Sequence, residues 1–257
     1  MLLSVEDIFK ILKKNGIKKG DNIFLHIDAF VTAFIVGSSL EKKIDNLICG
    51  FINYIGPNGT LILPTFSYSS TKNQPFNPLT TKSDVGIVTE YFRKKKNILR
   101  SSNPIFSVAS VGKLSEDFQK SSTSDCFGKG TCFDLMYKNN FWIITLGCSF
   151  DRITFIHYVD QFNNVSYRYF KNFKSIIINN SKNIESSIKY FVRDLNRQSS
   201  VKLDKLKQRL DELGFLSRDQ IGRANFLAVK SVNFFNVANE MISIKENIHI
   251  IEGNDGI

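Results

Sequence analysis

The chain has 257 residues, of which 42% are apolar, 12% aromatic and 23% charged. This composition excludes a disordered or fibrous protein and supplies enough apolar side chains for a sizeable core. Lys and Arg number 34 against 24 for Asp and Glu, which gives a formal charge of +10. Such a surplus suits nucleic acid, a membrane surface or a phosphorylated small molecule.

The first 66 residues alternate between helical and extended patterns. Ser4 and the acidic pair after it form a helix start, and Asn15-Gly16 forms a helix stop. Short apolar runs between the helical patterns are typical of buried strands. The alternation predicts an α/β sheet with helices on its faces. In chain order, the pattern predicts a helix over 4–14, a strand over 22–27, a helix over 39–54 and a strand over 60–66.

The rest of the chain continues this alternation with longer interruptions. A loop rich in Ser, Thr, Asn and Pro covers 67–84, and polar loops of this length are more often functional than decorative. We predict one domain over 1–257. Beyond this loop, the patterns predict a helix over 89–96, an extended segment at 107–111, a strand over 141–146, a helix over 155–162, an alternating segment at 175–178 with a turn at 179–180, and a helix over 203–213.

Several classes of protein and site are excluded at this point. Glu6 and Asp7 interrupt the apolar run that a signal peptide needs, and no apolar stretch reaches the ~18 residues that span a bilayer. We therefore expect a cytoplasmic protein with free thiols and no membrane insertion. The three histidines and four cysteines lack the close spacing of a zinc site, so no metal is expected.

A candidate catalytic segment follows the predicted strand that ends at Gly147. If a helix begins after the polar turn, Thr154, His157 and Asp160 lie on one face at i, i+3 and i+6. A neutral imidazole oriented by a carboxylate is the usual general base, and ligands of α/β sheets collect at strand ends. The alternative is a half-buried structural histidine, and spacing alone favours that alternative.

Other polar groups offer weaker signals. His26 and Asp28 follow the first strand and could line the same sheet edge, although His26 and His157 make a poor metal pair. Cys148 could pair with His157 as nucleophile and base, without further support. The basic run Arg93–Lys96 with Arg100 is typical of a solvated helix face.

A glycine-containing turn lies at residues 127–131. Gly128, Gly130 and Thr131 precede an apolar run that resembles a helix. Such a turn can present backbone N–H groups to a phosphate, but it matches neither a Walker loop nor a dinucleotide fingerprint. A capped turn without a ligand is an equally good interpretation.

Taken in order, these segments resemble the aminoglycoside 3-N-acetyltransferase family, of the type that is not built on the GNAT fold. The resemblance covers about residues 5–172, which we take as a family-like core, and leaves 173–257 as a C-terminal elaboration. The segments that carry it are 23–26, 55–66, 76–78, 86–93, 99–109, 127–128, 154–160 and 166–169.

The resemblance implies a three-layer α/β/α sandwich with a mixed central sheet, and an N-acetyltransferase that uses acetyl-CoA as co-substrate. His157 matches the family's catalytic histidine, and Asp160 stands where the family usually has glutamate. No cysteine matches a nucleophile, which favours direct attack by the amine. The resemblance assigns cofactor binding to His26, Thr65, Phe66, Arg100, Ser107, Gly128, Gly130 and Thr131, and substrate binding to Asp28, Tyr68, Asp151, Thr154 and Arg168.

The acceptor expectation rests on a departure from the family pattern. Drug-resistance members carry His-Ser-Ser-Leu after the first strand, whereas this chain has Asp28 two residues after His26. This departure indicates a different acceptor pocket. Members that resemble this version are typical of surface-polysaccharide biosynthesis, so the resemblance implies a nucleotide-linked amino sugar as acceptor, and the positive net charge mildly favours it. The alternatives are aminoglycoside acetylation, a degenerate family member without activity and a basic nucleic-acid-binding module. The last lacks a recognised motif, so no nucleic acid is expected; a homodimer is possible.

Overall fold

The computed structural model describes residues 2–179 and 182–251. Its centre is a seven-stranded mixed sheet with the order β3-β4-β2-β1-β5-β9-β8. Strand β1 pairs in parallel with β2 and β5, whereas the other neighbouring pairs are antiparallel. The strands are β1 (Asn22–Ile27), β2 (Thr60–Pro64), β3 (Leu99–Arg100), β4 (Val108–Gly112), β5 (Trp142–Leu146), β8 (Ser217–Ile221) and β9 (Ala224–Lys230).

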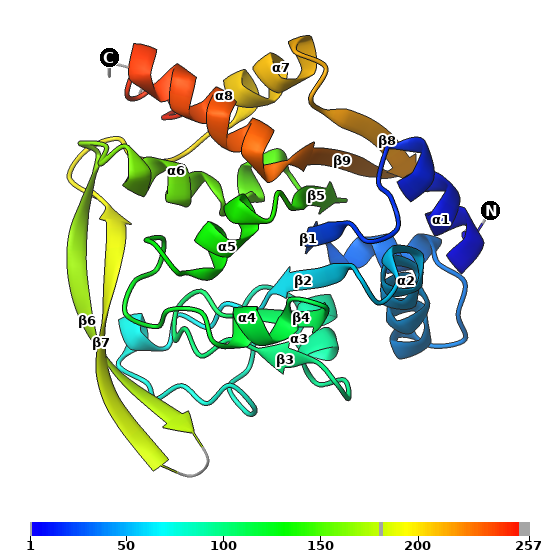
Figure 1. Cartoon of the computed structure of the whole chain (residues 1–257), viewed down its shortest axis with the longest axis horizontal. Helices are drawn as coiled ribbons and strands as arrows, with labels where there is room; N and C mark the ends of the chain where they lie inside the picture. The colour runs from blue at the N-terminus through cyan, green and yellow to red at the C-terminus, as the bar shows by residue number, and fades with distance from the viewer. Residues whose placement is uncertain (1, 180–181, 252–257) are drawn as a thin grey trace.

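Helices cover both faces of this sheet (Figure 1). Ile23 and Leu25 of β1 pack in one apolar cluster with the first three helices, whereas Phe24 points to the opposite cluster. This alternation is the period of two that a buried strand requires. The predicted three-layer α/β/α sandwich is confirmed. One layer holds α1 (Val5–Lys14), α2 (Leu40–Ile55) and α3 (Ile87–Arg93); the other holds α4 (Ser115–Gln119), α5 (Cys132–Lys138), α6 (Ile156–Phe162), α7 (Asp204–Glu212) and α8 (Ser231–Ile244).

Local sequence signals fix the elements of the first layer. Ser4 caps α1 in a capping box with Asp7, and Ser39 caps α2 through the backbone N–H of Lys42. Each predicted element of the first 66 residues is confirmed within two residues of its ends. Helix α3 covers Ile87–Arg93 and not 89–96. In the described ranges, no helix is both long enough and apolar enough to cross a bilayer.

A long two-stranded hairpin is the main element that the sequence patterns did not predict. It consists of β6 (Arg168–Asn179) and β7 (Lys182–Arg193) and forms an arm at one side of the molecule (Figure 1). Only the alternation at 175–178 pointed to it, and the predicted turn at 179–180 lies partly outside the described residues. Strands β8 and β9 and helix α8 were also not predicted.

The hairpin is hydrogen-bonded to two loops of the core. The backbone of Phe76 exchanges hydrogen bonds of 2.8 and 2.7 Å with Ile176 and Ile178. On the other strand, Lys189 bonds to the backbones of Ser124 and Cys126 at 2.9 and 3.0 Å. The arm therefore holds the loop 67–84 and the loop before α5, both of which border the site described next.

Candidate active site

The carboxyl ends of the parallel strands β1, β2 and β5 meet at one edge of the sheet. There a cavity of about 560 Å³ opens, which we call the Asp28 cavity. As predicted, His26 and Asp28 from β1 lie at the same edge as the turn after β5. Its lining consists of His26, Ile27, Asp28, Pro64, Phe66, Tyr68, Asp84, Val85, Gly86, Thr89, Cys148, Arg152 and Thr154.

The charged lining of the Asp28 cavity has more acidic than basic side chains. Among the described residues of the lining, Asp28 and Asp84 are the carboxylates and Arg152 is the cation, and Asp84 also forms an ion pair with Lys72, which lies outside the lining. The Asp28 carboxylate is fixed because it accepts a hydrogen bond of 2.9 Å from the backbone of Phe30. A neighbouring cavity of about 1000 Å³ shares Asp84 and continues along α3. That cavity also has Lys82, Glu90, Arg93 and Lys94 in its lining, so the carboxylate that suits a positively charged ligand is Asp28.

Helix α6 places His157 and Asp160 on one face, as the spacing predicted. The Nδ1 atom of His157 lies 3.2 Å from Oδ2 of Asp160. The other carboxylate oxygen accepts a 2.8 Å hydrogen bond from the hydroxyl of Tyr167, and Arg168 Nε lies 2.9 Å from Oδ2. Asp160 is fully buried, whereas the side chain of His157 is 23% exposed. The imidazole thus faces solvent on one side and a fixed carboxylate on the other.

The protonation of this pair follows from its surroundings. Burial and, to a smaller extent, the charge of Arg168 together lower the pKa of His157 to about 4, against the opposing effect of Asp160. Burial alone raises the pKa of Asp160, but its hydrogen bond with His157 and the charge of Arg168 outweigh this and hold the pKa below its usual range. At neutral pH the pair is a carboxylate beside a neutral imidazole, which is the state that a general base needs.

A second cavity of about 330 Å³ lies beside helix α6, and we call it the Phe127 cavity. The ring of Phe127 packs against His157 with a centroid distance of 5.5 Å, whereas Thr154, three residues before His157, lines the Asp28 cavity. His157 itself is part of neither lining, but it has a neighbour in each. The Phe127 cavity is lined by Phe127, Gly128, Lys129, Asp134, Lys138, Tyr158, Gln161 and Phe162.

The lining of the Phe127 cavity fits acetyl-CoA. Three aromatic rings offer an apolar wall, and Lys129 offers a cation for a phosphate, whereas Lys138 pairs with Asp134 of the same lining at 2.7 Å. Gln161 contributes a buried Oε1 atom that has no hydrogen-bond partner among the described residues, and an amide N–H of pantetheine is a suitable donor to it. When bound, acetyl-CoA would supply the acetyl group as a thioester.

The glycine turn does not offer its backbone N–H groups to a phosphate, so that interpretation of residues 127–131 is wrong. The N–H groups of Phe127 and Gly128 donate to Asp125 at 3.0 and 3.1 Å, and that of Gly130 donates to Asp134 at 2.7 Å. The turn does bind anions, but these are carboxylates of the chain itself. Thr131 donates its hydroxyl to the Gly128 carbonyl. Of the three expected cofactor residues Gly128, Gly130 and Thr131, only Gly128 lines the Phe127 cavity.

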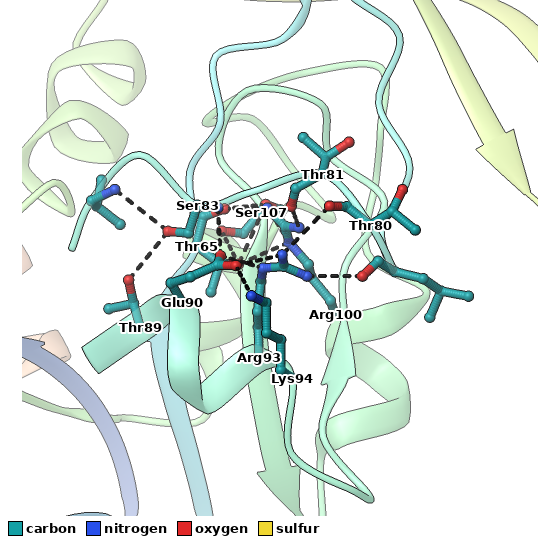
Figure 2. Close-up of polar contacts among 12 residues, drawn as sticks. Thr65, Thr80, Thr81, Ser83, Thr89, Glu90, Arg93, Lys94, Arg100 and Ser107 are labelled. Carbon is teal, nitrogen blue, oxygen red and sulfur yellow. Dashed lines mark hydrogen bonds and ion pairs between the residues drawn. The ribbon is translucent and has the colours of Figure 1, made fainter. Parts of the chain in front are cut away.

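The expected cofactor residues Thr65, Arg100 and Ser107 form a buried hydrogen-bond cluster instead. Arg100 is 5% exposed and donates to both side-chain hydroxyls and to the carbonyls of Thr65, Pro78 and Thr81. Figure 2 shows Arg100 in the middle of this cluster, next to Arg93. None of the three lines either cavity. They hold the loop 67–84 against the end of β2.

The basic run is not wholly the solvated helix face that its pattern predicted, because Arg93 and Arg100 are buried and three of its cations form ion pairs within the protein. The buried Arg93 donates to both oxygens of Glu90 at 2.6 and 2.7 Å, and Lys94 pairs with the same carboxylate at 2.8 Å (Figure 2). Lys95 pairs with Asp45. Most of this positive charge is therefore engaged in internal contacts.

The remaining expected substrate residues separate into two groups. Tyr68, Thr154 and Asp28 line the Asp28 cavity, together with the expected cofactor residues His26 and Phe66. Asp151 lies outside it, where its carboxylate accepts hydrogen bonds from Ser149 and from the backbone of Leu203. Arg168 is buried against His157 and Asp160.

Sequence reasoning missed four residues that shape the site. Asp84 and Arg152 face the Asp28 cavity, Tyr167 holds Asp160, and Gln161 borders the Phe127 cavity. Two of them had a usable signal: Tyr167 lies in the segment after the catalytic histidine, and Gln161 stands one turn after His157. Asp84 and Arg152 lie in loops, where no periodicity points to a face.

The described part of the chain brings together no group of three or more His, Cys, Asp or Glu side chains that could hold a metal ion.

Two buried histidines make the stability of the fold sensitive to acid. Burial lowers the pKa of His26 to about 3 and that of the fully buried His249 to about 4. The unfolded chain therefore binds more protons below pH 6.5, and the free energy of unfolding should fall on the order of 1 kcal/mol per pH unit for each histidine between pH 6.5 and 4. Urea unfolding at pH 7, 6 and 5 measures this dependence. His249→Gln should make it shallower; an unchanged slope would contradict this account.

The fold and the site suit a transferase that binds two substrates, with a carboxylate-held imidazole close to two cavities of an α/β sandwich. The model of the aminoglycoside 3-N-acetyltransferase family matches residues 34–243. The chain belongs to this family, whose members are acyltransferases that use acetyl-CoA. The expectations of an acyltransferase and of acetyl-CoA as co-substrate are confirmed at this level.

Individual relatives agree with the family. An aminoglycoside N(3)-acetyltransferase IV from Salmonella sp is 38% identical over 64 residues, which are 24% of this chain and 23% of that relative. The AAC(3)-IVa apoenzyme superposes with a TM-score of 0.82 at 18% identity, over 100% of this chain and 94% of its own. AAC-IIIb with CoASH superposes with a TM-score of 0.79 at 18% identity, over 98% of this chain and 100% of its own. A second AAC(3)-IVa structure is a complex with a gentamicin.

These comparisons correct the acceptor expectation. The matching family and the relatives are aminoglycoside acetyltransferases, so the nucleotide-linked amino sugar of surface glycan biosynthesis was the wrong choice. The physical error lies in the use of net charge. The surplus of +10 belongs to the whole chain and does not describe a single cavity. The lining of the Asp28 cavity holds two carboxylates and one arginine among the described residues, so it is not a basic site.

Proposed function

We propose that this chain transfers the acetyl group of acetyl-CoA to an amine of an aminoglycoside. The imidazole of His157, held by Asp160 and with a neighbour in the lining of each cavity, carries this proposal together with the family match. The polycationic acceptor would occupy the Asp28 cavity, where Asp28 attracts its ammonium groups. The acetyl donor would occupy the Phe127 cavity. The two reactants then meet at His157.

The chemistry requires an amine without its extra proton, because an ammonium has no free electron pair. His157 would take the proton that the attacking nitrogen loses as it bonds to the thioester carbon. Asp160, fixed by Tyr167, stabilises the imidazolium that results. The C–S bond then breaks, and the imidazolium returns the proton to the departing thiolate. Asp160 acts through His157 and is a positioning residue.

An acyl-cysteine intermediate does not fit the site. Cys148 lines the Asp28 cavity, but burial raises its pKa to about 11. A thiol in this state is a poor nucleophile at neutral pH, because the thiolate is the reactive form. Direct attack by the amine therefore needs fewer assumptions than a covalent intermediate at Cys148.

The proposed function is tested by thiol release from acetyl-CoA. Gentamicin and kanamycin serve as acceptors, and mass spectrometry of the product should show one added acetyl group. Glucosamine, which carries a single amine, is the matched weak acceptor. No acceptor-dependent release with either drug would contradict the proposal.

The acidic lining gives a prediction about affinity. Asp28→Asn keeps an oxygen that can accept from Phe30 but removes the charge. The KM for the aminoglycoside should rise roughly threefold to tenfold, more at low salt, with little change in the KM for acetyl-CoA. Steady-state kinetics measures both. Asp117→Asn on the exposed face of α4 is the matched control, and equal effects of both variants would count against the assignment.

A cytoplasmic location, one domain over 1–257 and a homodimer remain proposals. Fractionation of cells, limited proteolysis and light scattering of the purified chain test them in turn.

A further inference from the structure

Arg168 contacts both members of the catalytic pair. It begins strand β6 at the base of the hairpin arm, and its side chain is 3% exposed. Its Nη2 atom lies 2.8 Å from Nδ1 of His157, and its Nε atom lies 2.9 Å from Oδ2 of Asp160. Nη1 donates to the carbonyl of Phe191 at 3.1 Å. With these three contacts the guanidinium is fixed beside the imidazole.

The contact with Nδ1 determines where the imidazole proton lies. A guanidinium has only donors, so at 2.8 Å the Nδ1 atom of His157 must be the acceptor. The ring is neutral at pH 7, because burial lowers its pKa to about 4, and its proton is then on Nε2. A protonated Nε2 donates a hydrogen bond and cannot take a proton from an amine. The base of the proposed reaction is therefore blocked in this arrangement.

A competing arrangement is available at the same atom. Oδ2 of Asp160 lies 3.2 Å from Nδ1 and can only accept, so it favours the tautomer with the proton on Nδ1. An acceptor amine next to Nε2 presents N–H donors, which would face another donor if Nε2 kept its proton. Binding of the acceptor amine therefore favours the tautomer with the proton on Nδ1, because only that tautomer can accept a hydrogen bond at Nε2. A ligand shifts an equilibrium between two states only if it contacts them differently.

We propose that Arg168 is a positioning residue that holds resting His157 in the Nε2–H tautomer, and that acceptor binding moves the proton to Nδ1, where Asp160 replaces Arg168 as its partner. The ring gains one proton at Nδ1 and loses one at Nε2 by exchange with solvent, so its charge does not change. The second half rests on the proposed function. One consequence is that His157 cannot activate water against acetyl-CoA while the acceptor is absent.

The tautomer can be read directly by NMR of the full chain labelled with 15N-histidine at pH 7.5. The chain has three histidines, and His157→Ala assigns the signal of interest. We expect a protonated Nε2 in the resting protein and a protonated Nδ1 after addition of CoA and gentamicin. A resting protein with its proton on Nδ1 overturns the inference. Because the resting state is read without ligand, this result does not depend on whether the protein acetylates aminoglycosides.

Variants separate the role of Arg168 from mere support of the fold. Arg168→Met should move the proton to Nδ1 without any ligand and raise acceptor-independent thiol release severalfold. Arg168→Leu, which like methionine has no donor for Nδ1, covers the case in which the methionine variant does not fold. Tyr167→Phe removes the other hydrogen bond of Asp160 but leaves Nδ1 untouched, so it should keep the Nε2–H tautomer. A variant of Arg168 that folds and retains the resting tautomer contradicts the inference.

Discussion

Acceptor-dependent thiol release should fall by about 100- to 10,000-fold in His157→Ala, which is the usual contribution of a general base. The loss should appear mainly in kcat, because the Asp28 carboxylate that attracts the acceptor remains in place. The fold should survive, since the ring is partly exposed and its packing contact is the ring of Phe127. Thermal melting followed by circular dichroism checks this.

His157→Gln is the matched control for this prediction. Glutamine keeps a polar side chain of similar reach but has no basic nitrogen, so it should be as inactive as alanine. Turnover near that of the unchanged protein in either variant would remove His157 from the mechanism.

Replacing Arg100 by methionine should destabilise the protein by about 3–5 kcal/mol, since it disrupts a buried hydrogen-bond network. The guanidinium holds the carbonyls of Thr65, Pro78 and Thr81, and methionine leaves these oxygens without a donor. Denaturant unfolding measures the loss. Lys96→Met, at an exposed position of the same basic run, is the control and should change stability by less than about 0.5 kcal/mol.

The same variant distinguishes the two roles considered for Arg100. A residue that bound a phosphate of acetyl-CoA would change the KM for acetyl-CoA and leave stability nearly intact. A residue of the buried cluster changes stability and leaves the KM of the folded fraction nearly intact. A raised KM without destabilisation would restore the cofactor-binding expectation.

The elements that could be predicted from the sequence are those whose signals are local. Helices α1 and α2 can be recognised from their capping residues and apolar periodicity, and strands β1 and β5 from their short apolar runs. Each of these patterns lies within a window of a few residues. The hairpin β6–β7 does not, because its strands pair with each other and pack on loops, so their pattern mixes exposed aromatic, basic and buried residues.

The site shows the same division. The spacing of His157 and Asp160 could be read from one helix turn, and the structure places them side by side. Arg168 was predicted, but as a substrate ligand, since nothing in the sequence shows that β6 begins against α6. The phosphate-binding prediction for the glycine turn failed for a related reason. Asp125 and Asp134 flank the turn in sequence, but only the folded structure shows that their carboxylates accept hydrogen bonds from its backbone N–H groups.

The hydrogen bonds between Phe76 and strand β6 have a consequence for the entropy of ligand binding. They tie the middle of the loop 67–84 to the arm, which divides one long flexible segment into two short ones with fewer accessible conformations. The conformational freedom of Tyr68 and Asp84 is thus lost when the chain folds and not when the ligand arrives. Binding in the Asp28 cavity then carries little ordering cost, and the affinity reflects the contacts themselves.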